Sequence, residues 1–251
     1  MTNDNEVLKR QARNILFAGC MISAIYGLPF NLMPVTLGSA ADAYSFNAQQ
    51  IGLLGSALLA GAVLGNWIVF FVIKRFNWQK ISAIGIVMVA TGFGFSPFTG
   101  GSYLLYVAWF FAGIGFALPF TVALQTLAGL GNQEKTMGTK LTSEVLLGAV
   151  LLYLFPVFLV SRWGFNGAVL GLSAWMLLGL TVLSRIPRTY MNLNGAQTEA
   201  AFDFRSNLPA IVALLTLLVF SVVKPVFGPL LSGLVTISEW HPDIWASSWL
   251  F

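Results

Sequence analysis

The sequence has few charged residues for its length. Only 9% of its 251 residues are charged and 57% are hydrophobic, whereas ordinary soluble domains carry about 25% charged residues. A soluble core of this size cannot remove so much apolar surface from water, but a lipid bilayer can. The composition therefore indicates a membrane protein.

Residues that build reactive sites are equally scarce. The one cysteine, Cys20, excludes an intrachain disulfide, and the one histidine, His241, lies near the end of the sequence. We find no zinc-type Cys/His group, no G-x-S-x-G and no phosphate-binding glycine loop. The net charge of +4 comes from basic residues that lie between apolar runs and form no patch, which argues against a nucleic-acid partner. We therefore expect neither enzymatic activity nor a metal or other cofactor.

Long apolar runs are what the sequence has in quantity. A membrane-spanning helix needs about 20 predominantly apolar residues, and strands of a membrane barrel would be shorter and would alternate. The first run is too long for the apolar part of a signal peptide, so we expect it to be retained. The sequence predicts an all-α polytopic membrane protein with seven such runs, at residues 14–37, 49–73, 81–98, 103–127, 141–160, 167–183 and 208–237.

The distribution of basic residues predicts the orientation. Short cytoplasmic loops carry an excess of Lys and Arg, so we expect a cytoplasmic N-terminus in a bacterial-type inner membrane. Arg162 then falls outside and Lys224 lies in the seventh run, whereas eleven of the 13 basic residues fall inside: Lys9, Arg10, Arg13, Lys74, Arg75, Lys80, Lys135, Lys140, Arg185, Arg188 and Arg205.

Small residues and prolines predict how the helices pack. A stripe in the second run, formed by Ala57, Gly61 and Gly65, is typical of a close helix–helix contact. Trp78 and Tyr103, near the ends of runs, are expected in the interfacial aromatic belts. Kinks are expected at the prolines inside the runs, which are Pro29, Pro34, Pro119 and Pro156.

Three stretches resemble the amino-terminal half of a major facilitator superfamily transporter. "LPFNLMPVTLGSAADAYSFNAQQIGLLGSALLAGAVLG" (28–65) is similar to the first helix, outer loop and second helix of bacterial members. "WFFAGIGFALPF" (109–120) is similar to the fourth helix, and "LFPVFLVSRWGFNGAVLGLSA" (154–174) to the end of the fifth and the start of the sixth. The resemblance covers about residues 14–185.

The family's loop motif after its second helix, G-x-x-x-D-R-x-G-R-R, is degenerate in this chain. Arg75 matches it and Lys80 restores one basic residue, but Lys74 stands where the acidic residue belongs. The resemblance implies a cytoplasmic gate loop at Lys74, Arg75 and Lys80, without the family's charge relay. Trp109 also stands where many members have a membrane-embedded arginine.

The resemblance implies a six-helix bundle made of two inverted three-helix repeats, with a seventh transmembrane segment added. It divides the chain into a cytoplasmic segment (1–13), the six-helix half (14–185), a cytoplasmic loop (186–207), and the seventh segment with an outer tail (208–251). It implies secondary transport of a small solute, with a proton as a candidate coupling ion. Family members have two such halves, so we expect a truncated transporter, or a half that needs a second half or a homodimeric partner. The alternative is a non-transporting membrane protein, either an inactive remnant or a scaffold for another subunit.

Ionisable groups inside a bilayer are candidates for functional sites. Glu144 is the best of these, because a carboxylate near the inner end of the fifth run can take up a proton. The competing interpretation is an i, i+4 surface pair with Lys140 at the membrane interface. For Lys224 the alternatives are a broken helix at Pro225 or a side chain that reaches the outer interface.

Neutral polar residues complete the predicted pathway. Tyr26, Asn31 and Gln125 lie on helices that line the cavity in the family, so they are candidates for contact with solute. The competing interpretation is hydrogen bonding between helices. Asp42 and Arg162, both in outer loops, are a candidate pair that closes the outer face.

Overall fold

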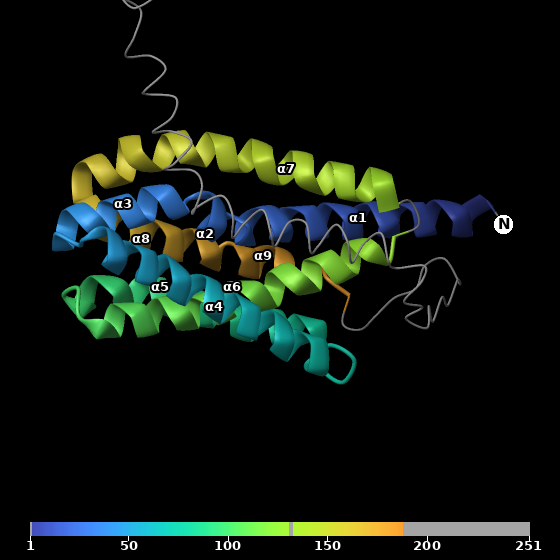
Figure 1. Cartoon of the computed structure of the whole chain (residues 1–251). Helices are drawn as coiled ribbons and strands as arrows, with labels where there is room; N and C mark the ends of the chain where they lie inside the picture. Colours follow the sequence, from blue (N-terminus) through green and yellow to red (C-terminus); the bar gives the residue numbers. More distant parts are fainter. Residues whose placement is uncertain (1, 131–132, 188–251) are drawn as a thin grey trace, which may run out of the picture. The chain divides into compact units, whose positions relative to one another are not determined.

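A computed structural model describes residues 2–130 and 133–187, and in these ranges the chain folds into helices joined by short turns, without a strand (Figure 1). The chain divides into two compact units, Met1–Ala196 and Gln197–Phe251, and every described helix belongs to the first. The seventh run (208–237), Lys224 and most of the loop predicted at 186–207 lie outside the described residues. The helices are α1 (Thr2–Tyr26), α2 (Leu28–Asn31), α3 (Met33–Tyr44), α4 (Ala48–Val72), α5 (Trp78–Phe95), η1 (Ser96–Thr99), α6 (Tyr103–Ala128), α7 (Gln133–Leu154), η2 (Phe155–Val160), α8 (Ser161–Leu177) and α9 (Gly179–Leu183).

Five helical stretches in the described part of the chain are long and apolar enough to cross a membrane. They are Arg10–Tyr44, Ala48–Val72, Trp78–Thr99, Tyr103–Ala128 and Gln133–Leu183. The last has 51 residues and contains both the fifth and the sixth predicted runs. Its backbone leaves the helical conformation at Gly164 (φ 56°, ψ −139°), and beyond this residue α8 folds back along η2 (Figure 1).

Prolines shape the first and the fifth stretches as expected. α1 ends at Tyr26, and Pro29 and Pro34 occupy the first turns of α2 and α3, because proline is tolerated where a helix begins. Pro156 lies in η2, a short π-helix. Pro119 is different, since it lies inside α6 without interrupting it.

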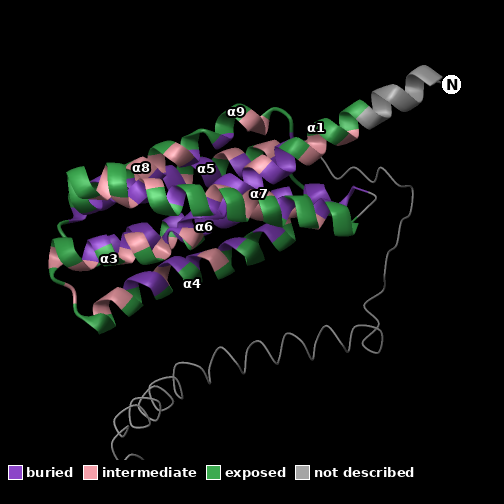
Figure 2. Cartoon of the chain, turned by 90° about the horizontal axis from the view of Figure 1, so that it is seen from above, coloured by how far each residue is buried: buried purple, intermediate pink, exposed green. Residues whose placement is uncertain are grey.

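Glycines bring α4 and α5 into close contact with α6. A Cβ at Gly61 would lie 2.0 Å from the carbonyl oxygen of Phe110, and one at Gly65 would lie 2.8 Å from the Cβ of Ala117. On the other side of α6, a Cβ at Gly115 would lie 2.4 Å from the backbone nitrogen of Val89. The predicted contact along Gly61 and Gly65 is therefore confirmed. α6 is the central helix of the group, and buried residues run along its length (Figure 2).

Most of the basic residues that the structure describes belong to segments at one end of this helical unit. The N-terminal part of α1, the α4–α5 turn, the end of α6, the start of α7 and the end of α9 lie at that end (Figure 1). A side-chain contact ties two of these segments together, because Gln79 Nε2 donates to the carbonyl oxygen of Ile186 at 2.8 Å. Arg162, in contrast, follows η2 at the opposite end.

Aromatic side chains pack against one another at the opposite end. Tyr44, at the end of α3, has its ring centre 5.3 Å from that of Phe165 and 5.4 Å from that of Phe46. Phe46 in turn stacks on Tyr106, with 6.2 Å between the ring centres. These contacts join the ends of α3, α6 and α8.

Candidate functional site

The charged pair in α7 points into the helical unit. Lys140 Nζ lies 2.5 Å from Glu144 Oε2, so the predicted i, i+4 pair is present. It is not a surface pair, however, because Lys140 is 7% exposed and the Glu144 side chain is 17% exposed. The competing interpretation, a surface pair, therefore predicts the contact correctly, but the pair is largely buried between helices.

Two other helices complete the surroundings of the pair. Ser23 Oγ in α1 donates to Glu144 Oε2 at 3.4 Å. Phe120 in α6 presents its ring to the ammonium group, with Lys140 Nζ 5.0 Å from the ring centre. An ammonium group over an aromatic face is attracted by the ring quadrupole. The pair is thus held by α1, α6 and α7 together, and we call Ser23, Phe120, Lys140 and Glu144 the pair site.

Gly27 makes room for the carboxylate. A Cβ at this position would lie 2.6 Å from Glu144 Oε1 and 2.9 Å from its Cδ, so any other residue would displace the glutamate. Four residues later in each of the two facing segments, the glycine lies in α7 and the polar side chain lies in α2. There a Cβ at Gly148 in α7 would lie 2.9 Å from Asn31 Nδ2. Each of these polar side chains therefore lies against a glycine of the facing element, and α7 packs closely on α1 and α2.

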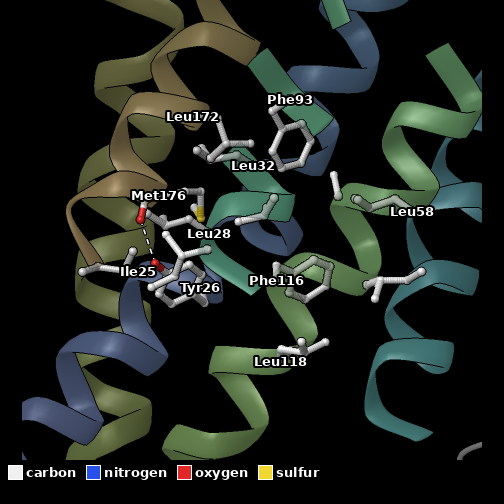
Figure 3. Close-up of a cluster of buried hydrophobic side chains, with 14 of the residues drawn as sticks. Ile25, Tyr26, Leu28, Leu32, Leu58, Phe93, Phe116, Leu118, Leu172 and Met176 are labelled. Carbon is white, nitrogen blue, oxygen red and sulfur yellow. Dashed lines mark hydrogen bonds between the residues drawn. The ribbon is translucent and has the colours of Figure 1, made fainter. Parts of the chain in front are cut away.

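Tyr26 is a link between helices. Its side chain is fully buried, and its hydroxyl group donates to the carbonyl oxygen of Met176 in α8 at 2.7 Å (Figure 3). A Cβ at Gly179 would lie 2.0 Å from the Tyr26 hydroxyl oxygen, so this glycine is required for the contact. The competing interpretation of Tyr26, hydrogen bonding between helices, therefore fits the structure.

Gln125 is separate from the pair site. It is exposed and borders a small hollow of about 10 Å³ together with Ile15 in α1, Trp78 in α5 and Pro187. That hollow lies at the basic end of the helical unit. The structure thus places Tyr26, Asn31 and Glu144 on neighbouring elements, α1, α2 and α7, but leaves Gln125 elsewhere.

A polar contact that the sequence analysis missed lies one turn before Gln125. Thr121 Oγ1 donates to Asn66 Oδ1 at 2.5 Å, and Asn66 is exposed on α4. Neutral polar residues inside apolar runs are the signal that could have found it, since such groups tend to bond across helices.

The predicted gate loop is held by its uncharged residues. Asn77 caps α5 by accepting from the backbone N–H of Gln79 at 2.9 Å. Trp78 Nε1 donates to the carbonyl oxygen of Ile73 at 2.9 Å. Trp78 is 3% exposed, so its predicted place in an interfacial belt is wrong: its ring packs against protein. The basic residues Lys74, Arg75 and Lys80 are exposed.

Two other expectations have clear outcomes. Asp42 and Arg162 are both exposed and form no ion pair with each other, so the candidate closure of the outer face by this pair is not present. Trp109, where many family members have an arginine, is fully buried and donates through Nε1 to Ser96 Oγ at 3.2 Å. It also packs edge to face on Phe93, so its role here is structural.

The chemistry available at the pair site is that of a partly desolvated carboxylate, an ammonium group and an aromatic face. Across residues 10–130 and 133–187, no three His, Cys, Asp or Glu side chains come together in a group that could hold a metal ion. Sequence reasoning missed Phe120 and Ser23, which belong to the pair site, and Gly27, which makes room for its carboxylate. An aromatic, a serine and a glycine in apolar runs have no distinguishing signal of their own.

Comparison with known proteins does not assign the chain to a family. No protein-family model matches it, and no curated protein matches it either. The class of protein follows from the helices themselves: five helical stretches of the described residues have the length and composition to cross a membrane.

Proposed function

We propose that the chain forms one half of a secondary transporter for a small solute, related to the major facilitator superfamily, in which Glu144 is the coupling carboxylate. The observation that carries this proposal is the pair site. An ionisable pair inside a helical unit of this apolarity is costly to desolvate, and intramembrane ionisable residues typically mark the path of a solute or ion. An exposed pair of the same spacing would carry no such implication.

The pairing of the helical stretches supports the inverted three-helix repeats. The two arms that meet at Gly164 count as separate crossings in this proposal, which makes six. In chain order the crossings are α1 to α3, α4, α5, α6, α7, and α8 with α9, and an inverted repeat relates the first three to the last three. The contact of α4 with α6 then corresponds to that of α7 with α1, and the contact of α5 with α6 corresponds to that of α8 and α9 with α1. The contacts of α1 with α6 and of α5 with α8 correspond to themselves. All of these contacts are present.

The gathering of basic residues at one end supports the proposed orientation. Because cytoplasmic loops are enriched in Lys and Arg, we assign the end with Arg10, Lys74 and Arg185 to the cytoplasm. The N-terminus is then cytoplasmic, and the aromatic end that contains Tyr44 and Phe165 faces outward. A bacterial-type inner membrane is the location that fits this arrangement.

A transporter half needs an opposing wall. In two-half transporters the solute is held near the midplane between the repeats, so we propose that a second half or a second copy of the chain completes the cavity. The competing function, a non-transporting scaffold or inactive remnant, rests on the same pair site, since Lys140 and Glu144 also tie α7 to α1 and α6.

The test is solute-driven proton movement in vesicles. The purified full chain is reconstituted with a trapped pH-sensitive dye, and glucose, lactate, alanine, choline and uridine are added in turn. We expect at least one solute to move protons at a rate well above that of protein-free vesicles. If none does so, while Lys140→Ala and Glu144→Ala lower the thermal stability to similar extents, then the scaffold function is correct.

A further inference from the structure

We propose that Glu144 and Phe120 form a binding subsite for the ammonium group of an organic cation, and that the side chain of Lys140 occupies this subsite in the present structure. The inference rests on the proposed function and names the substrate class. It starts from the Lys140 ammonium, which is 2.5 Å from a carboxylate oxygen and 5.0 Å from the centre of an aromatic ring. A carboxylate together with an aromatic face is a combination that recognises alkylammonium groups.

The surroundings exceed what an ion pair within one helix requires. Lysine and glutamate four residues apart reach each other on any helix, without help from other elements. Here α6 contributes the Phe120 ring, and α1 contributes the Ser23 hydroxyl and the recess at Gly27. Three helices therefore converge on the ion pair: α6 presents its ring to the ammonium group, and α1 surrounds the carboxylate on α7 that holds it.

Lys140 is suited to act as a removable occupant. Its side chain is a flexible four-carbon stem, and it belongs to the part of α7 nearer the basic end of the helical unit. The ammonium can withdraw toward that end while its stem stays on apolar surface. Until a solute arrives, Lys140 neutralises Glu144, because an unpaired carboxylate in this environment would be strongly unfavourable.

The geometry selects among solutes by charge. A cationic amine replaces the Lys140 ammonium with like charge and shape, so both Glu144 and the Phe120 ring keep their partners. An anion would meet the carboxylate, and a neutral sugar would leave the carboxylate unpaired once Lys140 withdrew. The subsite therefore favours primary to quaternary alkylammonium groups.

The first experiment is chemical rescue of Lys140→Ala. Thermal unfolding of the purified full chain in detergent is followed by tryptophan fluorescence in ethylammonium chloride and in sodium chloride at equal concentration. We expect Lys140→Ala to unfold below the wild type, and ethylammonium to raise its midpoint by about 2–4 °C over sodium. The exposed Lys80 provides the control, because Lys80→Ala should respond equally to both salts.

Two double variants locate the effect. In Lys140→Ala/Glu144→Gln and in Lys140→Ala/Phe120→Leu, the difference between ethylammonium and sodium should disappear. An equal response to ethylammonium in the single and double variants, or no difference from sodium in Lys140→Ala, overturns the subsite.

A second measurement applies if Lys140→Ala does not fold. Uptake of radiolabelled choline is measured in vesicles that contain wild-type protein or Phe120→Leu, because choline is permanently charged and does not cross the bilayer as a neutral base. Loss of the ring should lower uptake roughly 2- to 30-fold, the range expected for a cation–π contact. Equal uptake by the two proteins, or choline uptake by neither, contradicts the proposal.

The two proposals fail in different ways. If lactate, glucose or uridine, which carry no ammonium group, moves protons while choline and alanine do not, transport stands and the ammonium subsite falls. If no solute moves protons but ethylammonium rescues Lys140→Ala through Glu144 and Phe120, the subsite stands and transport falls.

Discussion

The contact between α4 and α6 can be tested with a pair of glycine variants in one helix. A Cβ added at Gly61 would lie 2.0 Å from the Phe110 carbonyl oxygen and 3.1 Å from the Cα of Gly113, whereas a Cβ at Gly52 meets nothing within 4 Å. The obstacle at Gly61 is backbone, which cannot rotate out of the way. α4 must therefore move off α6 in Gly61→Ala, and Gly52→Ala requires no movement.

The magnitude follows from two opposing terms. Overpacking costs about 1–3 kcal/mol, while alanine is favoured over glycine inside a helix by about 0.8–1 kcal/mol. Because the clash at Gly61 is with backbone, we expect its cost to lie near the upper end, which leaves Gly61→Ala destabilised by about 2 kcal/mol. For a chain of this size that is roughly 4–8 °C in the unfolding midpoint. Gly52→Ala should be neutral or slightly stabilised.

The assay is thermal unfolding in detergent, followed by the recovery of monodisperse protein on size exclusion. A larger change, Gly61→Leu, should also lower the yield of folded protein, whereas Phe71→Leu should be mild because Phe71 is exposed. Should Gly61→Ala unfold at the same temperature as Gly52→Ala, the close contact between α4 and α6 is refuted.

Three further predictions follow from the same structure. Gly27→Ala should displace the Glu144 carboxylate and destabilise the chain by about 1–3 kcal/mol, measured by thermal unfolding. In a Glu144→Ala background the same Gly27→Ala change should cost clearly less than in the wild type, and an equal cost in both backgrounds would mean that the clash lies elsewhere. Tyr26→Phe removes a buried hydrogen bond to α8 and should cost about 1 kcal/mol; an unchanged midpoint would remove this link from the account. In a cysteine-free background, a membrane-impermeant maleimide added to intact cells should label Ala43→Cys and not Gln133→Cys, and the reverse result would invert the proposed orientation.

The helices and their close contacts could be predicted from the sequence because they depend on local properties. Run length and composition determine which segments suit a bilayer, and a glycine every four residues marks one face of a helix for close approach. The stripe at Gly61 and Gly65 was found for that reason. The reversal at Gly164 was also foreseeable in position, since the fifth and sixth predicted runs end and begin on either side of it.

The pair site could be predicted only in part. The spacing of Lys140 and Glu144 establishes that the side chains reach each other, but it does not establish which way that face of α7 points. That direction depends on how α7 packs against α1 and α6, and this packing in turn depends on residues such as Gly27 and Phe120 far away in the sequence. Trp78 was misplaced for the same reason: a tryptophan at a helix end suits an interfacial belt, yet here its indole N–H has a partner within the fold.

The most direct test of the central claim is the effect of Glu144→Gln on transport in reconstituted vesicles. Glutamine keeps the shape of the side chain but cannot exchange a proton, so coupling is lost while the solute path remains. For any solute without an ammonium group that moves protons through the wild type, we predict that Glu144→Gln abolishes accumulation driven by a pH gradient and leaves solute exchange at equal pH largely intact. For a solute that carries an ammonium group, Glu144→Gln should lower exchange as well, because Glu144 is then also part of its binding subsite. Accumulation by Glu144→Gln at the wild-type rate would contradict the account, and the Lys140–Glu144 pair would then be a structural link between α7 and its neighbours.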